Sequence, residues 1–146
     1  MAMKKVLFVC SGNTCRSPMA QAAFNDLAKK TETDAVAFSA GLYTDDGLPY
    51  SQNTIDVLAE NGIALTGASR RITEEMLAGC DLVFGLTYSL STALVSAFPA
   101  NSDSIYRFPL EVPDPFGGDI VLYRRSFAKI REGVEKILAA IRENKL

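Results

Sequence analysis

The sequence contains no histidine, which is the most frequent general base and metal ligand in proteins. A Cys–His nucleophile pair is therefore excluded, and any cysteine chemistry must obtain its thiolate from backbone dipoles or cationic side chains. The three cysteines, Cys10, Cys15 and Cys80, are an odd number and lack the spacing of a disulfide framework. Because no fourth ligand accompanies them, they also make a poor zinc site. We expect neither a metal nor a cofactor.

Strong charge and long apolar runs are missing as well. The formal net charge is −2 and the isoelectric point is about 5.2, which argues against a nucleic-acid-binding surface, since such surfaces depend on Lys and Arg. No apolar run approaches the roughly 18 residues that span a bilayer. The run at residues 6–9 is too short for a signal peptide. We therefore expect a cytoplasmic protein that binds neither nucleic acid nor membrane.

Alternating strand and helix patterns fill the chain. Of its 146 residues, 48% are apolar and 22% charged, and no repeat or linker divides it, so we expect a single domain over residues 1–146. The patterns predict strands at 6–10, 35–39, 81–86 and 105–108, and helices at 17–30, 52–61, 73–79, 89–98 and 120–144. This alternation predicts an α/β fold, with a parallel sheet covered by helices on both faces.

The most informative segment follows the first predicted strand and reads Cys-Ser-Gly-Asn-Thr-Cys-Arg-Ser-Pro from Cys10 to Pro18. Backbone N–H groups of residues 11–15 can turn inward, and the forked guanidinium of Arg16 suits two oxygens of one anion. A helix that begins directly afterwards points its positive dipole end at the same spot. The segment therefore predicts a site for a tetrahedral oxyanion, with the Cys10 thiolate at its base.

Small residues support this interpretation. Gly12 and Asn13 are types that tolerate the left-handed backbone of a tightly curled loop. Ser17 and Pro18 are typical of the N-cap and the first position of a helix. We expect Ser17 to cap the helix. Its hydroxyl is also of a type that can donate to the Cys10 sulfur, a second role that the family resemblance described next favours.

The segment Cys10–Pro18 resembles the phosphate-binding loop of the low-molecular-weight protein tyrosine phosphatase family. The sequence Asp114-Pro115-Phe116 resembles the general-acid loop of that family, and Ser39-Ala40-Gly41 matches a third short signature. The order and spacing of these segments extend the resemblance over nearly the whole chain. It implies a three-layer α/β/α domain with a four-stranded parallel sheet in the order 2-1-3-4 and the phosphate-binding loop after strand 1.

The resemblance, together with the chemistry above, assigns roles to these residues. Cys10 is the expected nucleophile and forms a phosphoenzyme, which Arg16 and the loop hold. Asp114, flanked by Pro113 and Pro115 and expected to be shielded from water, is the general acid and then the general base. The expected phosphate- and substrate-binding residues are Ser11, Gly12, Asn13, Thr14, Cys15, Arg16, Ser17 and Phe116.

Further residues are expected to support the site. The resemblance makes Asn13 and Ser39 structural braces of the loop, and it makes Cys15 a redox partner that can protect Cys10 through a reversible disulfide. Arg70 matches a recurrent arginine of the family, while Gly67 stands near where many members have a histidine. We place Leu42 and Tyr43 at the rim of the pocket.

The loop also bears on the substrate. Tyrosine-specific relatives usually carry bulky apolar residues where this chain has Ser11 and Thr14, and the sequence Phe116-Gly117-Gly118 also departs from them. Together these residues resemble the protein-arginine phosphatase branch. We therefore expect a protein phosphatase that releases inorganic phosphate from phosphoarginine, with phosphotyrosine as the alternative. The oligomeric state does not follow from the sequence, and a monomer is the simplest expectation.

Two other functions use a similar loop. Arsenate reduction needs two further cysteines near the end of the third strand, where this chain has residues 86–90 without cysteine and places Cys80 at the strand's start. A phosphate-binding module without catalysis would lack one of the reactive residues, but Cys10, Arg16, Ser17 and Asp114 are all present. Both functions are therefore weaker hypotheses than hydrolysis.

Overall fold

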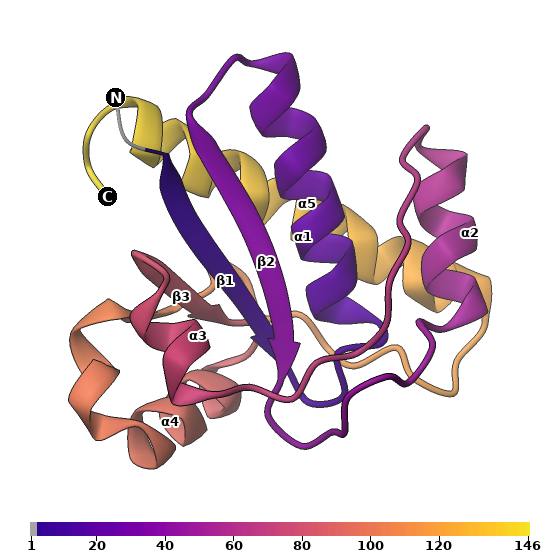
Figure 1. Cartoon of the computed structure of the whole chain (residues 1–146). Coiled ribbons are helices and arrows are strands. Elements are labelled where there is room, and N and C mark those ends of the chain that lie inside the picture. The colour runs from indigo at the N-terminus through magenta and orange to yellow at the C-terminus, as the bar shows by residue number, and fades with distance from the viewer. Residues whose placement is uncertain (1–2) are drawn as a thin grey trace.

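The computed structural model describes residues 3–146 and centres on a four-stranded parallel sheet (Figure 1). The strand order β2-β1-β3-β4 confirms the predicted fold class and topology. Cys10, the last residue of β1, pairs in register with Gly41, the last residue of β2. The sulfur therefore lies at the carboxyl edge of a central strand, where ligands bind in open α/β sheets. The strands are β1 (Lys4–Cys10), β2 (Ala35–Gly41), β3 (Leu82–Gly85) and β4 (Ile105–Arg107).

Helices cover both faces of the sheet and form the three predicted layers (Figure 1). One face packs against α1 (Arg16–Lys30) and α5 (Ile120–Arg142), with α2 (Gln52–Glu60) beside them. The other face packs against α3 (Glu74–Ala78) and α4 (Tyr88–Ala97). A 3-10 helix, η1 (Pro99–Ser104), was not predicted: the proline that ends α4 also starts this tighter turn.

Strand β1 is buried on both sides, which explains its continuous apolar run. Val6 and Phe8 point into the core shared with α1 and α5, whereas Leu7 and Val9 point into the core shared with α3 and α4. The Phe8 ring packs against three other aromatic rings with centroid separations of 5.8 to 6.0 Å, those of Phe24, Phe84 and Phe108. Burying each such side chain contributes about 1.5–3 kcal/mol. The strand that carries Cys10 is thus firmly held.

The start of α1 differs from the sequence prediction. Ser51, Thr73, Thr87 and Asp119 cap the other α-helices by accepting a backbone N–H. Helix α1 instead begins at Arg16, with Cys15 at its N-cap and no capping side chain. The prediction that Ser17 caps the helix is therefore wrong, because its hydroxyl is used by other partners, and Pro18 lies within the first turn.

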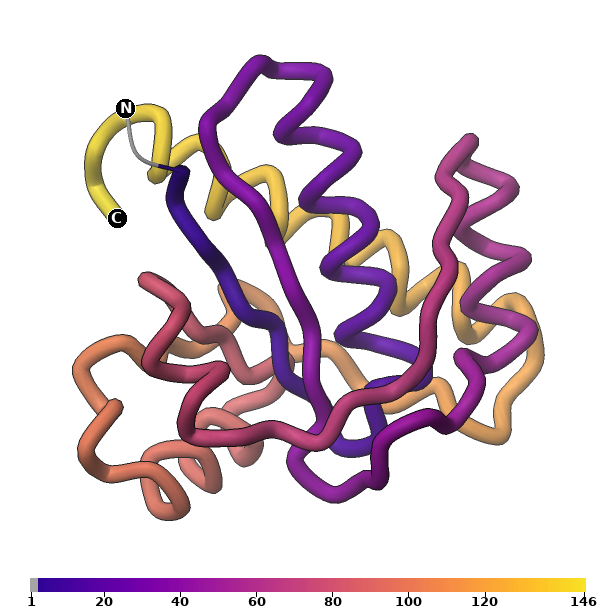
Figure 2. Tube along the Cα trace, in the orientation of Figure 1, coloured from indigo at the N-terminus to yellow at the C-terminus, as the bar shows by residue number. Residues whose placement is uncertain are grey.

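The two ends of the described chain lie far from Cys10. Figure 2 shows the start of β1 and the end of α5 at one end of the molecule, and Lys4, Ile141 and Arg142 line the same surface hollow there. The carboxyl edge of the sheet lies at the opposite end of β1, where loops follow the strands. Within residues 3–146, every helix is too short or too polar to span a membrane.

Candidate active site

The loop between β1 and α1 curls around the Cys10 sulfur. The backbone N–H of Asn13 donates to Cys10 Sγ at 3.3 Å, and the Ser17 hydroxyl lies 2.9 Å from the same sulfur. Asn13 adopts the predicted left-handed backbone, with φ of 54°. Gly12 does not, so that part of the prediction is wrong. A side chain is instead excluded at Gly41, where a Cβ would lie 2.9 Å from the Ser11 carbonyl oxygen.

Asn13 braces the loop from behind. Its side-chain Nδ2 donates to Ser17 Oγ at 2.8 Å and to Ser39 Oγ at 3.0 Å, and its Oδ1 accepts the Arg70 backbone N–H at 2.8 Å. Because Ser17 accepts from Asn13, its own proton can be donated to Cys10, which favours the thiolate. The structure thus brings together the three residues that we expected to support the site.

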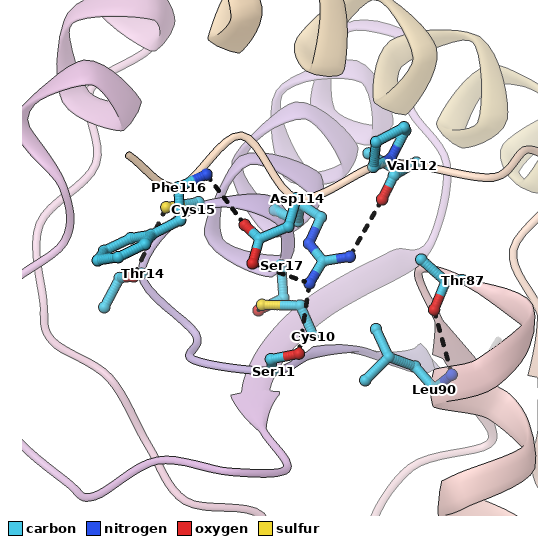
Figure 3. A network of polar contacts seen from close by, with 12 residues as sticks. Cys10, Ser11, Thr14, Cys15, Ser17, Thr87, Leu90, Val112, Asp114 and Phe116 are labelled. Atoms are coloured by element: carbon cyan, nitrogen blue, oxygen red, sulfur yellow. Dashed lines mark hydrogen bonds and ion pairs between the residues drawn. The ribbon is translucent and has the colours of Figure 1, made fainter. Parts of the chain in front are cut away.

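The Arg16 guanidinium is buried and lines the same pocket as Cys10. Figure 3 shows two of its neighbours, Ser11 and Asp114, near Cys10. Its Nη1 donates to the Val112 carbonyl at 3.1 Å, and its Nη2 lies 3.4 Å from Ser11 Oγ and 3.6 Å from Asp114 Oδ2. Among the described residues, its buried Nε has no hydrogen-bond partner. A buried cation is costly unless its donors are paired. The remaining donors of Arg16 fit an oxyanion that presents two oxygens.

Asp114 faces the same pocket but is not shielded from water. Its side chain is 49% exposed, and the neighbouring Phe116 is 74% exposed. The flanking prolines shape the loop without covering the carboxylate, so the predicted shielding is wrong. Asp114 Oδ1 accepts the Phe116 N–H at 3.1 Å, which orients the carboxylate. The 3.6 Å separation from Arg16 is longer than a charge-assisted hydrogen bond, so this ion pair can be exchanged for a ligand.

These side chains surround a pocket of about 320 Å³. Asn13 and Ser17, which we predicted to bind phosphate, do not line it and lie behind the sulfur. Leu42, predicted at the rim, packs against the core instead. Tyr43 does line the pocket, as does Thr44, which sequence reasoning missed. The lining residues are Cys10, Ser11, Gly12, Thr14, Cys15, Arg16, Tyr43, Thr44, Leu48, Asp114 and Phe116. Within residues 3–146, no three His, Cys, Asp or Glu side chains come close enough to hold a metal ion.

Comparison with known proteins agrees with this geometry. The family described as low molecular weight phosphotyrosine protein phosphatase matches residues 5–146. This chain belongs to that family. Two Bacillus subtilis relatives match almost end to end: a protein-arginine-phosphatase is 29% identical over 96% of this chain and 98% of its own, and the low molecular weight protein-tyrosine-phosphatase YfkJ is 34% identical over 98% and 99%.

A solved structure gives the same result in three dimensions. A YwlE arginine phosphatase with a phosphorylated active-site serine in place of a cysteine is 28% identical to this chain, with a TM-score of 0.93 and coverage of 97% of both chains. This member of the phosphatase family therefore has the same fold as an arginine phosphatase whose solved structure carries a phosphoryl group at the active site.

In this phosphatase-family chain, Thr14 and Cys15 of the loop are held by residues that we did not predict to be part of the site. Thr14 O accepts from Ser51 N at 3.1 Å and from Thr54 Oγ1 at 2.9 Å, and Cys15 Sγ lies 3.2 Å from Tyr123 Oη. Burial, with the hydrogen bond to Cys15, raises the pKa of Tyr123 to about 12. Cys10 and Cys15 are both free thiols, and the redox role of Cys15 stays a prediction.

Proposed function

We propose that this chain is a protein phosphatase that works through a phosphocysteine at Cys10. The observation that carries the proposal is the free Cys10 thiol, which receives the Asn13 N–H and the Ser17 hydroxyl beside buried Arg16. These donors stabilise a thiolate without a histidine. Asp114, the proposed general acid, faces the same pocket.

The reaction proceeds in two steps. The Cys10 thiolate attacks phosphorus, the bond from phosphorus to the substrate oxygen or nitrogen breaks, and Asp114 protonates the leaving group. Water then attacks the phosphocysteine while the Asp114 carboxylate takes its proton. The S–P bond breaks, inorganic phosphate leaves and the thiolate is restored. In both steps Arg16 and the loop N–H groups balance the charge of the phosphoryl oxygens.

Protein phosphoarginine is the proposed substrate. The Thr14 side chain lines the pocket and gives it a polar wall, and the half-exposed Asp114 carboxylate can accept hydrogen bonds from a guanidinium. The first of the two Bacillus relatives above is named for phosphoarginine. The second candidate is protein phosphotyrosine, which the apolar rim of Tyr43, Leu48 and Phe116 favours, since a phenyl ring packs well against such a surface.

A paired assay decides between these substrates. We expect wild type to hydrolyse a phosphoarginine peptide in preference to the matching phosphotyrosine peptide. Thr14→Ile removes the hydroxyl and makes the wall apolar, so the preference should shift toward phosphotyrosine by at least about tenfold in the ratio of kcat/KM values. A phosphotyrosine preference in wild type that Thr14→Ile leaves unchanged would instead assign the tyrosine substrate and remove Thr14 as the selector.

Asp114→Ala tests the general acid. We expect a loss of about 10²–10⁴-fold in kcat/KM for a substrate with a basic leaving group, because the departing atom then leaves unprotonated. An aryl phosphate with an acidic phenol needs little protonation and should lose far less. The matched control is Asp119→Ala, which removes a nearby carboxylate that caps α5 and does not line the pocket. Equal losses of Asp114→Ala on both substrates would exclude the acid role.

A further inference from the structure

Gln21 lies at the outer end of the hydrogen-bond chain that begins at Cys10. It is located one turn after Ser17 in α1 and is half-buried. The hydroxyl of Ser39, in β2, donates to Gln21 Oε1 at 2.6 Å. This contact ties the brace of the catalytic loop to the helix that follows the loop.

The direction of each hydrogen bond follows from counting protons. A hydroxyl has one proton, and Ser39 gives its proton to Gln21, so the same oxygen can only accept from Asn13 Nδ2, at 3.0 Å. The Arg70 N–H bound to Asn13 Oδ1 fixes which end of the Asn13 amide donates. By accepting the Ser39 proton, Gln21 makes the Ser39 oxygen an acceptor for the Asn13 amide.

The same count applies on the Cys10 side. The second Nδ2 hydrogen of Asn13 goes to Ser17 at 2.8 Å, which leaves the Ser17 proton for Cys10 Sγ at 2.9 Å. The alternative acceptor for that proton, the Ala40 carbonyl, is farther away, at 3.4 Å. Asn13 thus donates to both serines. Each serine hydroxyl then donates to a further partner, Ser17 to the Cys10 sulfur and Ser39 to Gln21.

We propose that Gln21 is a positioning residue for phosphoryl transfer at Cys10, acting through Ser39 and Asn13 on the hydrogen bond that Ser17 donates to the thiolate. This inference rests on the proposed phosphatase function. Without the Gln21 acceptor, the buried Ser39 proton loses its partner, and the serine can turn away from Asn13. The donation from Ser17 then becomes less well aligned.

An amide suits this position because it accepts a hydrogen bond without carrying charge. The ionisable groups around the chain of hydrogen bonds are Arg16 and Asp114 on the pocket side. On the far side, Gln21 lines a second hollow of about 200 Å³ with Arg70 and Tyr50. Gln21 does not titrate, so its contribution to the brace carries no charge at any pH.

The test compares Gln21→Met, which keeps the length of the side chain and removes the acceptor, with Gln52→Met. Gln52, at the start of α2, is exposed, and its side-chain amide donates to Asp56. We expect Gln21→Met to lower kcat/KM on para-nitrophenyl phosphate by about three- to tenfold. The midpoint of the pH dependence of Cys10 alkylation by iodoacetamide, followed on the Cys10 peptide, should rise by about 0.5–1 pH unit. Gln52→Met should match wild type in both measurements.

Two further variants separate positioning from general structural damage. Gln21→Glu retains an acceptor for Ser39, so its maximal kcat/KM should stay within about twofold of wild type. In a Ser39→Ala background, Gln21→Met should cause no additional loss, because the step through which it acts is already removed.

Either of two results would overturn the inference: a wild-type rate and alkylation profile in Gln21→Met, or an undiminished effect of Gln21→Met in the Ser39→Ala background. The alkylation profile requires no turnover. A wild-type chain that hydrolyses no phosphate compound would therefore contradict the proposed function, while the alkylation profile would still test the role of Gln21.

Discussion

Cys10→Ser is expected to abolish turnover and leave phosphate binding in place. Serine is close to cysteine in size, and its oxygen can accept the Asn13 N–H that now reaches the sulfur at 3.3 Å. A neutral hydroxyl with no general base beside it is a far weaker nucleophile than a thiolate, so kcat should fall by more than about 10⁴-fold. Arg16 and the loop N–H groups are unchanged, and calorimetric titration should give a phosphate affinity close to that of wild type.

The matched control for this variant is Cys80→Ser. Cys80 lies outside the pocket and packs against the core between the sheet and helices α3 and α4. Burial raises the pKa of its thiol. Its replacement should leave kcat unchanged on every substrate. Turnover by Cys10→Ser within tenfold of wild type would exclude the phosphocysteine mechanism.

Arg16→Lys is also expected to cause a large loss of activity. The guanidinium bonds the Val112 carbonyl through Nη1 and approaches Ser11 and Asp114 through Nη2. A lysine keeps the charge, but its single ammonium cannot hold Val112 and two phosphoryl oxygens at once. Removing such a donor typically costs about 10²–10³-fold in rate. We expect kcat/KM to fall by that amount and phosphate to bind more weakly.

The control for Arg16→Lys is Arg125→Lys, an exposed arginine of α5 that is outside the pocket. It should behave as wild type in steady-state kinetics and phosphate titration. Thermal unfolding of both variants shows whether the fold is retained. A kcat/KM for Arg16→Lys within about threefold of wild type would mean that the fork geometry of Arg16 is not needed for phosphoryl transfer.

The parts of the fold that sequence reasoning predicted are those governed by local patterns. The continuous apolar run of β1 indicated a strand buried on both faces, and Asn61 followed by Gly62 correctly marked the end of α2, where Gly62 has a φ of 73°. The strand order followed from the family resemblance rather than from periodicity. At the site, residue types and spacing predicted that Cys10 and Arg16 share one pocket, and the family resemblance added Asp114; all three line that pocket.

The parts that were missed depend on contacts across the chain. Ser17 has the residue type of a helix cap, but α1 begins at Arg16, and the Ser17 hydroxyl is bound by the Cys10 sulfur and the Asn13 amide. Nothing in the local sequence shows that Gln21 would end the brace or that Tyr123, more than a hundred residues away, would contact Cys15. The exposure of Asp114 depends on how its loop lies against the pocket, which proline content alone does not determine.

The hydrogen bonds that hold Thr14 from α2 have a consequence for engineering. The Thr14 carbonyl is fixed by Ser51 and Thr54, while Asn13 is fixed by Ser39 and Arg70. Each of these partners is far along the chain from the loop. The nine-residue motif Cys10–Pro18 therefore cannot be expected to keep its shape outside this fold. A linear peptide of that sequence, or a graft onto another strand–helix junction, lacks the hydrogen bonds from these distant residues. A transplant that keeps function has to carry the surrounding segments with it.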